Sequence, residues 1–118
     1  MIYVAHAIRG SEPHSAGKQQ ANLERAREAA KLIRQKYPDL EFYVPAEHDD
    51  FPQECLRRGL LSVNDILSVD LSILKRCNEL WVLLPENDCG LSAGVVGEIA
   101  YAASQGIPVW FTTMEELQ

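Results

Sequence analysis

Four short apolar segments, separated from one another by helical or polar stretches, constrain the fold of this chain more than any other feature. They lie at Ile2–Ala5, 41–44, 80–84 and 106–111. Strands that alternate with helices are typical of a mostly parallel sheet with right-handed crossovers and helices on both of its faces. The sequence therefore predicts one α/β domain over residues 1–118. We expect it to be Rossmann-like or flavodoxin-like, with four to five strands in the order 2-1-3-4.

The intervening segments differ in the strength of their helical pattern. Alanine, leucine and isoleucine recur at helical spacing from about residue 17 to 37, and again from 63 to 76. A third helix is expected after the Ser/Gly-rich turn at 89–94. The pattern predicts an acidic loop at 46–52, a short helix at 53–61 and a polar tail at 114–118.

Charge and hydropathy exclude two classes of partner. The net charge is −6, which argues against affinity for nucleic acid polymers or anionic membrane surfaces. No apolar run approaches the roughly 20 residues that a membrane-spanning helix needs. Met1 leads directly into a strand, so no signal peptide is expected. We expect no membrane partner.

The cysteines and histidines give no sign of a disulfide framework or a metal site. The three cysteines are odd in number and form no C-x-x-C pair, which favours free thiols in a reducing, cytoplasmic compartment. His6, His14 and His48 do not space with the cysteines as zinc ligands would. None of the glycine patterns is a dinucleotide or P-loop motif, and we expect neither a metal nor another cofactor.

The strand at 80–84, the turn that follows it and the next helix form the strongest candidate site. A strand, a small-residue turn and a helix N-terminus make a natural anion site. Glu98 lies about a turn and a half into that helix, where Gly94 and Gly97 leave room for a ligand. It is a candidate nucleophile or general base, and the alternative is an ordinary solvated carboxylate.

Four further residues are candidates for chemistry. Asp70 and Asp65 compete for the role of a second acid on the helix before the third strand, and spacing alone does not choose between them. Arg9, directly after the first strand, would clamp a phosphate through its guanidinium, or is an ordinary surface arginine. Tyr3 either packs in the core or directs its hydroxyl toward a carboxylate.

In chain order these motifs resemble the nucleoside 2-deoxyribosyltransferase superfamily, most closely its 2′-deoxynucleoside 5′-phosphate N-hydrolase branch and small phage and bacterial relatives. The motifs are Ile2-Tyr3 with Ile8-Arg9-Gly10, then Glu47-His48, then Asp70-Leu71, and finally Ser92-x-Gly94-Val95-x-x-Glu98-Ile99. The resemblance covers nearly the whole chain, and the last motif is the most specific.

The resemblance implies cleavage of the N-glycosidic bond of a nucleotide. Glu98 would be the nucleophile, Asp70 would assist the leaving base or orient the sugar, and Tyr3 would position or polarise the Glu98 carboxylate. The family pattern further implies substrate and phosphate contacts from His6, Arg9, Gly10, His48, Ser92 and Gly94. It also implies a homodimer or larger homo-oligomer, with hydrolysis favoured over transfer to a second base.

Two functions therefore remain open. The first is an enzyme that cleaves a nucleoside 5′-monophosphate. The second is a non-catalytic module that sequesters a small nucleotide. The joint presence of Tyr3, Asp70 and Glu98 favours the enzyme, because a pure binder has no need of a nucleophile.

Overall fold

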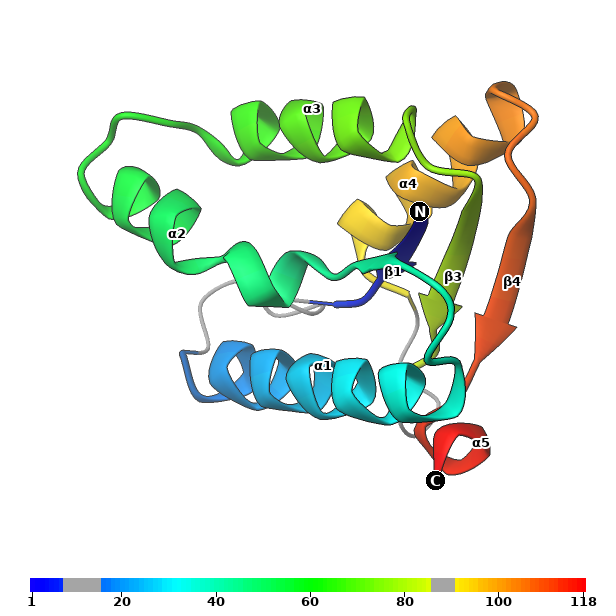
Figure 1. Ribbon diagram of the computed structural model, residues 1–118. Helices are drawn as coiled ribbons and strands as arrows, with labels where there is room; N and C mark the ends of the chain where they lie inside the picture. Colours follow the sequence, from blue (N-terminus) through cyan, green and yellow to red (C-terminus); the bar gives the residue numbers. More distant parts are fainter. Residues whose placement is uncertain (8–15, 86–90) are drawn as a thin grey trace.

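The computed structural model describes residues 1–7, 16–85 and 91–118 (Figure 1). Its elements follow one another as β1 (Ile2–Ala5), α1 (Ala16–Lys36), β2 (Phe42–Tyr43), the 3₁₀ helix η1 (Pro45–His48), α2 (Asp50–Arg57), α3 (Val63–Leu74), β3 (Glu79–Leu83), α4 (Ala93–Ser104), β4 (Val109–Thr112) and α5 (Met114–Leu117). The predicted α/β class is confirmed.

The four strands form one parallel sheet in the order β2-β1-β3-β4, as the sequence predicts. The register aligns Val4 of β1 with Trp81 of β3, and Trp81 with Trp110 of β4. Because successive side chains of a strand point to opposite faces, these three residues share one face of the sheet. Tyr3 faces the other side of the sheet, together with the residues aligned with it, Tyr43 of β2 and Leu80 of β3.

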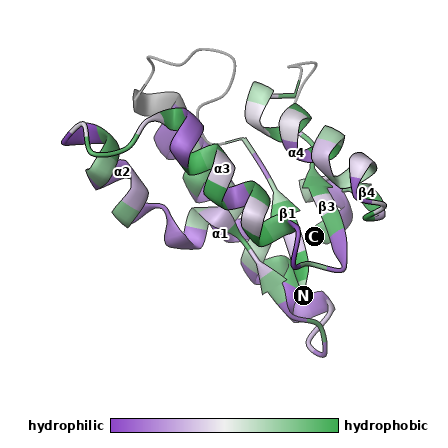
Figure 2. Ribbon diagram, turned by 90° about the horizontal axis from the view of Figure 1, so that it is seen from above, coloured by the Kyte–Doolittle hydropathy of each residue, from purple (hydrophilic) through white to green (hydrophobic). Residues whose placement is uncertain are grey.

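Helices cover both faces of the sheet (Figure 1). α1 and α5 lie on the face that carries Val4, and α3 and α4 lie on the face that carries Tyr3. Each face has its own hydrophobic cluster. In Figure 2 the central strands are coloured mainly as hydrophobic, whereas α3 alternates between hydrophobic and hydrophilic positions, as expected of a helix with one buried side.

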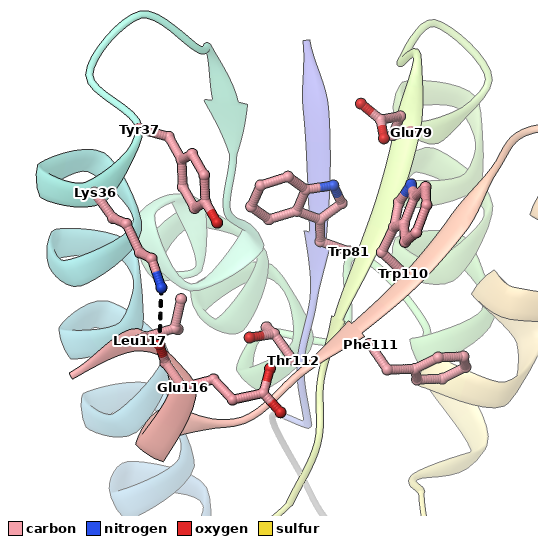
Figure 3. Close-up of a pocket in the computed structure, with 9 residues that line it drawn as sticks. All are labelled: Lys36, Tyr37, Glu79, Trp81, Trp110, Phe111, Thr112, Glu116 and Leu117. Carbon is pink, nitrogen blue, oxygen red and sulfur yellow. Dashed lines mark hydrogen bonds between the residues drawn. The ribbon is translucent and has the colours of Figure 1, made fainter.

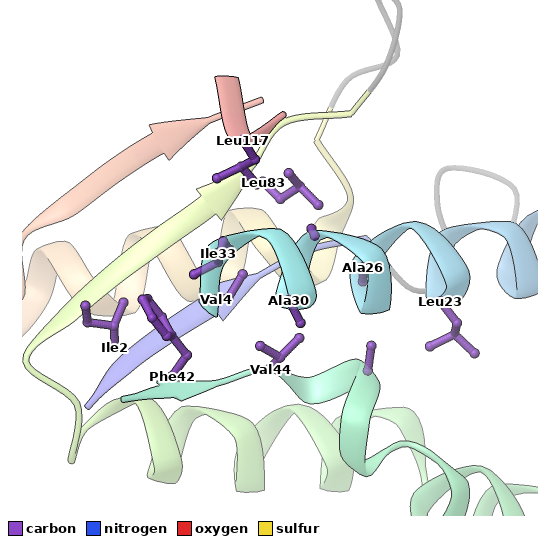
Figure 4. Close-up of a cluster of buried hydrophobic side chains, with 12 residues drawn as sticks. Ile2, Val4, Leu23, Ala26, Ala30, Ile33, Phe42, Val44, Leu83 and Leu117 are labelled. Atoms are coloured by element: carbon purple, nitrogen blue, oxygen red, sulfur yellow. The ribbon is translucent and has the colours of Figure 1, made fainter. Parts of the chain in front are cut away.

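The cluster beneath α1 shows how helical spacing produces this packing (Figure 4). Leu23, Ala26, Ala30 and Ile33 recur every three or four residues and are buried against the sheet. Small side chains at two of these positions let the helix backbone approach the strands closely. Pro38 follows the helix and cannot continue it, which agrees with the predicted end.

The segment between β2 and α3 differs from its prediction. The expected acidic loop at 46–52 contains η1 and the start of α2, and α2 begins at Asp50 rather than at residue 53. Pro52 causes this error, because proline is tolerated in the first turn of a helix, where its missing N–H would have no intrahelical acceptor. The helix ends at Arg57, before Gly59 at φ +72°, and not at residue 61.

Other boundaries move for local reasons. β2 is only two residues long, and α3 ends at Leu74 rather than at 76. β4 starts only at Val109, after a turn in which Gly106 has φ +71°. The expected polar tail forms α5, because the Thr113 side chain accepts a hydrogen bond from the Glu116 backbone N–H and Leu117 is buried.

None of the helices in the described part of the chain is long and apolar enough to cross a membrane. This agrees with the absence of a long apolar run in the sequence.

Candidate functional site

A cavity of about 250 Å³ lies on the sheet face covered by α3 and α4, near the carboxyl end of β1. Its walls come from the following described residues: Tyr3, His6, Pro45, Asp49, Gln53, Val63, Ile66, Leu67, Asp70, Ser92, Ala93, Gly94, Val95 and Glu98. In parallel α/β sheets, ligands bind at the carboxyl ends of the strands near the point where the strand order reverses. Here that point lies between β1 and β3.

Glu98 is buried in this cavity, with only 6% of its surface exposed. The helical pattern of α4 explains its position, because Val95 and Ala102 on the same side of the helix are also buried against the sheet. Burial raises the pKa of Glu98 to about 7, the nearby Tyr3 hydroxyl lowers it, and the Asp70 carboxylate raises it. Glu98 is therefore not a solvated helix carboxylate.

Tyr3 lies on the sheet face toward α4 and is fully buried. Burial and then the negative charges of Glu98 and Asp70 strongly raise the pKa of its hydroxyl, so Tyr3 keeps its proton. The hydroxyl lies close enough to Glu98 to affect that group's pKa, but no hydrogen bond of ordinary geometry joins the two. A buried hydroxyl without a partner among the described residues is a donor available to a ligand or to the carboxylate.

Asp70 is half-buried and lines the same cavity from α3. Burial, and secondly the charge of Asp49, raise the pKa of Asp70 to about 6. Asp65 instead forms a capping box with Ser62 at the start of α3, and its exposed carboxylate accepts hydrogen bonds from Ser62. Five helical residues turn the chain by about 500°, which leaves the two side chains about 140° apart. The structure thus places Asp70, and not Asp65, in the cavity.

Of the two predicted histidines, only His6 lines the cavity, and both of its ring nitrogens lie near backbone groups. His6 lines the cavity, but its Nε2 accepts a hydrogen bond of 3.1 Å from the Ala46 backbone N–H, and its Nδ1 lies 3.4 Å from the Ala7 carbonyl oxygen. Burial lowers the pKa of His6 to about 4, so the ring is neutral. His48 is exposed and stacks on Tyr43, with ring centroids 5.0 Å apart, and is not one of the residues that line the cavity.

The N-terminus of α4 forms one wall of the cavity. Ser92 begins the helix, where its Oγ accepts a hydrogen bond of 3.3 Å from the Val95 backbone N–H. A Cβ placed on Gly94 would lie 3.4 Å from the Leu67 side chain of α3, so Gly94 marks a point where α3 and α4 approach each other closely. The predicted phosphate contacts Arg9 and Gly10 lie outside the described residues.

Another part of the cavity wall was not predicted from the sequence. Asp49 and Gln53 reach the cavity from the start of α2, and Ile66 and Leu67 of α3 give it an apolar side. Asp49 belonged to a segment expected to be a loop. The sequence signal that could have identified Asp49 is its position shortly after the second strand. The carboxyl end of that strand lies beside the carboxyl end of the first strand.

A second cavity, of about 220 Å³, lies on the other face of the sheet (Figure 3). The rings of Tyr37, Trp81 and Trp110 stand along it, with the Lys36 side chain at one side and the Glu79 carboxylate at the far end. Its described lining residues include no pair of buried acids, so we place the candidate chemistry in the first cavity.

The first cavity combines a buried carboxylate, a second carboxylic acid and a protonated phenol. Such a set suits attack by a carboxylate on an electrophilic carbon with transfer of a proton to the leaving group. Among the described residues, no group of three or more histidine, cysteine, aspartate or glutamate side chains is arranged to hold a metal ion. No protein-family model, curated protein or solved structure matches the chain.

Proposed function

We propose that this protein hydrolyses the N-glycosidic bond of a nucleoside 5′-monophosphate through a covalent intermediate on Glu98. The observation that carries the proposal is the convergence of Glu98, Asp70 and Tyr3, from three separate elements, on one cavity. The resemblance of the sequence motifs to nucleoside 2-deoxyribosyltransferases supplies the substrate class.

In the first step, the ionised Glu98 carboxylate attacks the anomeric carbon, and a new C–O bond forms as the C–N bond breaks. The base leaves with the bonding electrons and takes a proton from Asp70. In the second step, water attacks the same carbon and loses its proton to Asp70, and the Glu98 carboxylate is released. Two successive displacements retain the configuration of the sugar.

The neighbouring groups support this sequence of events. Asp70 has a pKa of about 6 and Glu98 a pKa of about 7, so the pair with one proton holds it mainly on Glu98. The competent form has the proton on Asp70 and an ionised Glu98, and it is the minor arrangement of that pair, about one in ten. The protonated Tyr3 hydroxyl would donate to the Glu98 carboxylate when it becomes the leaving group of the second step.

The phosphate would lie at the N-terminus of α4, against Ser92 and Gly94. This 12-residue helix directs its first backbone N–H groups and the positive end of its dipole toward that wall. Arg9 and Gly10 are proposed to complete the phosphate contacts, on the basis of the family motif.

The test is incubation with a panel of deoxyribo- and ribonucleoside 5′-monophosphates, with free base measured by chromatography and the protein mass measured after acid quenching. We expect base release by the wild type, a sugar-phosphate adduct on Glu98, and no turnover by Glu98→Gln. Tight binding without base release or adduct would favour the alternative, a module that sequesters a nucleotide. Retained activity in folded Glu98→Gln would exclude Glu98 as the nucleophile.

The phosphate requirement has its own test. Arg9→Ala should weaken binding of a 5′-monophosphate about ten- to hundredfold and leave the matching nucleoside nearly unchanged, since charge-assisted contacts are worth about 1.5–3 kcal/mol. Calorimetric titration of both ligands into both proteins measures the difference. Equal losses for the two ligands would mean that Arg9 supports its own loop and does not contact phosphate.

A further inference from the structure

The second cavity, on the α1 side of the sheet, is built from residues that neighbouring strands bring together. Glu79 and Trp81 are two residues apart in β3, so their side chains share one face of the sheet. The register aligns Trp81 with Trp110 of β4, the edge strand. Tyr37 directly follows α1 and lines another side (Figure 3). The candidate catalytic cavity lies on the opposite face, so a ligand bound here would not depend on the proposed reaction.

The aromatic rings of this cavity hold one another in place. The Trp81 ring contacts Tyr37 in a T-shaped arrangement, with centroids 5.2 Å apart and planes at 79°, and its centroid lies 5.3 Å from that of Phe42. Such contacts fix the orientation of the Trp81 ring. Trp110 is 59% exposed, and in Figure 3 its ring stands beside Trp81 on the side away from Tyr37. The cavity therefore offers aromatic surface that is already ordered.

The charged groups of the lining are one lysine and two glutamates. Lys36 Nζ donates a hydrogen bond of 3.0 Å to the Glu116 carbonyl oxygen and lies 5.9 Å from the centroid of the Tyr37 ring. Glu79 is half-buried, and its carboxylate forms no hydrogen bond or ion pair with the residues that the structure describes. One lysine against two glutamates leaves the lining with a net charge of −1.

This combination of rings and charge suits a small organic cation. Aromatic faces attract a cation within about 6 Å of the ring centroid, and alkylated ammonium ions are bound where several rings surround them. A half-buried carboxylate without a partner adds a direct attraction. The volume of about 220 Å³ equals the space of about seven water molecules, which suits a ligand of about seven non-hydrogen atoms.

We propose that the cavity between Glu79, Trp81 and Trp110 binds a small alkylated ammonium ion. The cationic head lies between the Trp110 ring and the Glu79 carboxylate, at the end of the cavity away from Lys36 (Figure 3). Its alkyl groups contact the Trp81 ring. Because that ring is already held by its aromatic neighbours, binding costs little conformational entropy.

The two tryptophans provide a direct measurement, because they are the only ones in the chain and both line this cavity. Choline is the cationic probe, 3,3-dimethylbutan-1-ol is an uncharged molecule of the same shape, and 3,3-dimethylbutyrate is an anion of similar shape. In ¹⁵N-labelled protein at constant ionic strength, choline should shift both indole N–H signals saturably, with a Kd of about 1 mM or tighter. The alcohol should bind at least about tenfold more weakly, and the anion should not bind.

Substitutions test the carboxylate and the ring separately. Glu79→Gln keeps the shape of the side chain and should weaken choline binding about three- to tenfold without affecting the alcohol. Glu115→Gln is the matched control. It removes the same charge from an exposed residue of α5 that is not part of the lining, and should leave choline binding unchanged. Trp110→Leu, at the exposed edge of the sheet, should weaken choline binding more than binding of the alcohol, because leucine is apolar but has no ring face.

Several results would overturn the proposal. One is the absence of a saturable shift of either indole signal at about 10 mM choline. Another is equal affinity for choline and the alcohol, or unchanged choline binding by Glu79→Gln. Tighter binding of 3,3-dimethylbutyrate than of choline would assign the cavity to an anion held by Lys36. Indole signals that move only with protein concentration would assign it to a contact between two copies of the chain.

Discussion

The buried charge of Glu98 destabilises the folded protein at neutral and alkaline pH. Its pKa is about 7 in the folded state against an ordinary value of 4.5, because burial disfavours its charged form. Between these two values the unfolded chain releases the proton first, so the folded state loses stability as the pH rises through this window. The full cost, about 3 kcal/mol, is reached above pH 7.

Glu98→Gln should therefore stabilise the protein more as the pH rises. An amide of the same shape does not ionise, so the variant avoids the cost. We expect its free energy of unfolding, relative to wild type, to improve by up to about 3 kcal/mol between pH 5 and pH 8. Urea unfolding of both proteins at several pH values measures this. Parallel pH dependence of the two curves would show that Glu98 ionises normally.

Substitution of Asp70 should mainly reduce activity, whereas substitution of Asp65 should mainly reduce stability. Asp70→Asn removes the proposed proton donor and should slow base release by about 10²- to 10⁴-fold, most strongly for poor leaving bases. Asp65→Asn weakens the capping box with Ser62 and should lower the melting temperature with little effect on turnover. Rate assays and thermal melts of both variants check the assignment, and an inactive Asp65→Asn beside a normal Asp70→Asn would refute it.

At the scale of elements, α4 joins the sheet to the candidate site. One side of the helix buries Val95, Glu98 and Ala102, and its first turn forms a wall of the cavity. Two glycines interrupt it. A Cβ on Gly94 would lie 3.4 Å from Leu67, whereas a Cβ on Gly97 would meet nothing within 4 Å.

The two glycines should respond differently to alanine. Gly97→Ala should stabilise the protein by up to about 1 kcal/mol and leave nucleotide binding unchanged, because alanine favours the helix and Gly97 is exposed. Gly94→Ala should weaken binding of a 5′-monophosphate, because the added methyl group enters the cavity wall. Calorimetric binding and thermal melts distinguish the two, and equal binding by both variants would place the phosphate elsewhere.

At the scale of the whole molecule, the sheet ends at β4 with two large exposed side chains. Trp110 and Phe111 are 59% and 52% exposed, on opposite faces of this edge strand. The adjacent α4 exposes only uncharged residues: Ala93, Val96, Gly97, Ala100, Ala103 and Ser104. An uncharged edge is a surface on which two chains of net charge −6 can meet without repulsion.

We therefore propose that two copies associate through β4 and α4, in agreement with the homodimer implied by the motifs. A double substitution of Trp110→Lys and Phe111→Lys should convert the dimer to a monomer, since lysine on an edge strand opposes pairing. Leu60→Lys is the control, because Leu60 is 69% exposed in the α2–α3 connection, away from this edge. Light scattering gives the mass of each protein, and a monomeric wild type would contradict the proposal.

The sequence by itself determined the sheet and the principal acids. Apolar strands alternating with helices specify parallel pairing and the order 2-1-3-4, because right-handed crossovers leave few other arrangements. The buried side of α4, visible as Val95, Ile99 and Ala102, also placed Glu98 on the sheet. Local spacing carries this information, so it can be read without coordinates.

Only the tertiary structure decided which other side chains join these acids and in what protonation state. Asp49 enters the cavity because Pro52 allows α2 to begin early, and His48 stays out because it stacks on Tyr43. The capping box with Ser62 engages Asp65 at the start of α3, and Asp70, the acid that the family motif favours, is the one that lines the cavity. The raised pKa values of Glu98 and Asp70 arise from burial and from charges distant in sequence, which spacing along the chain does not encode.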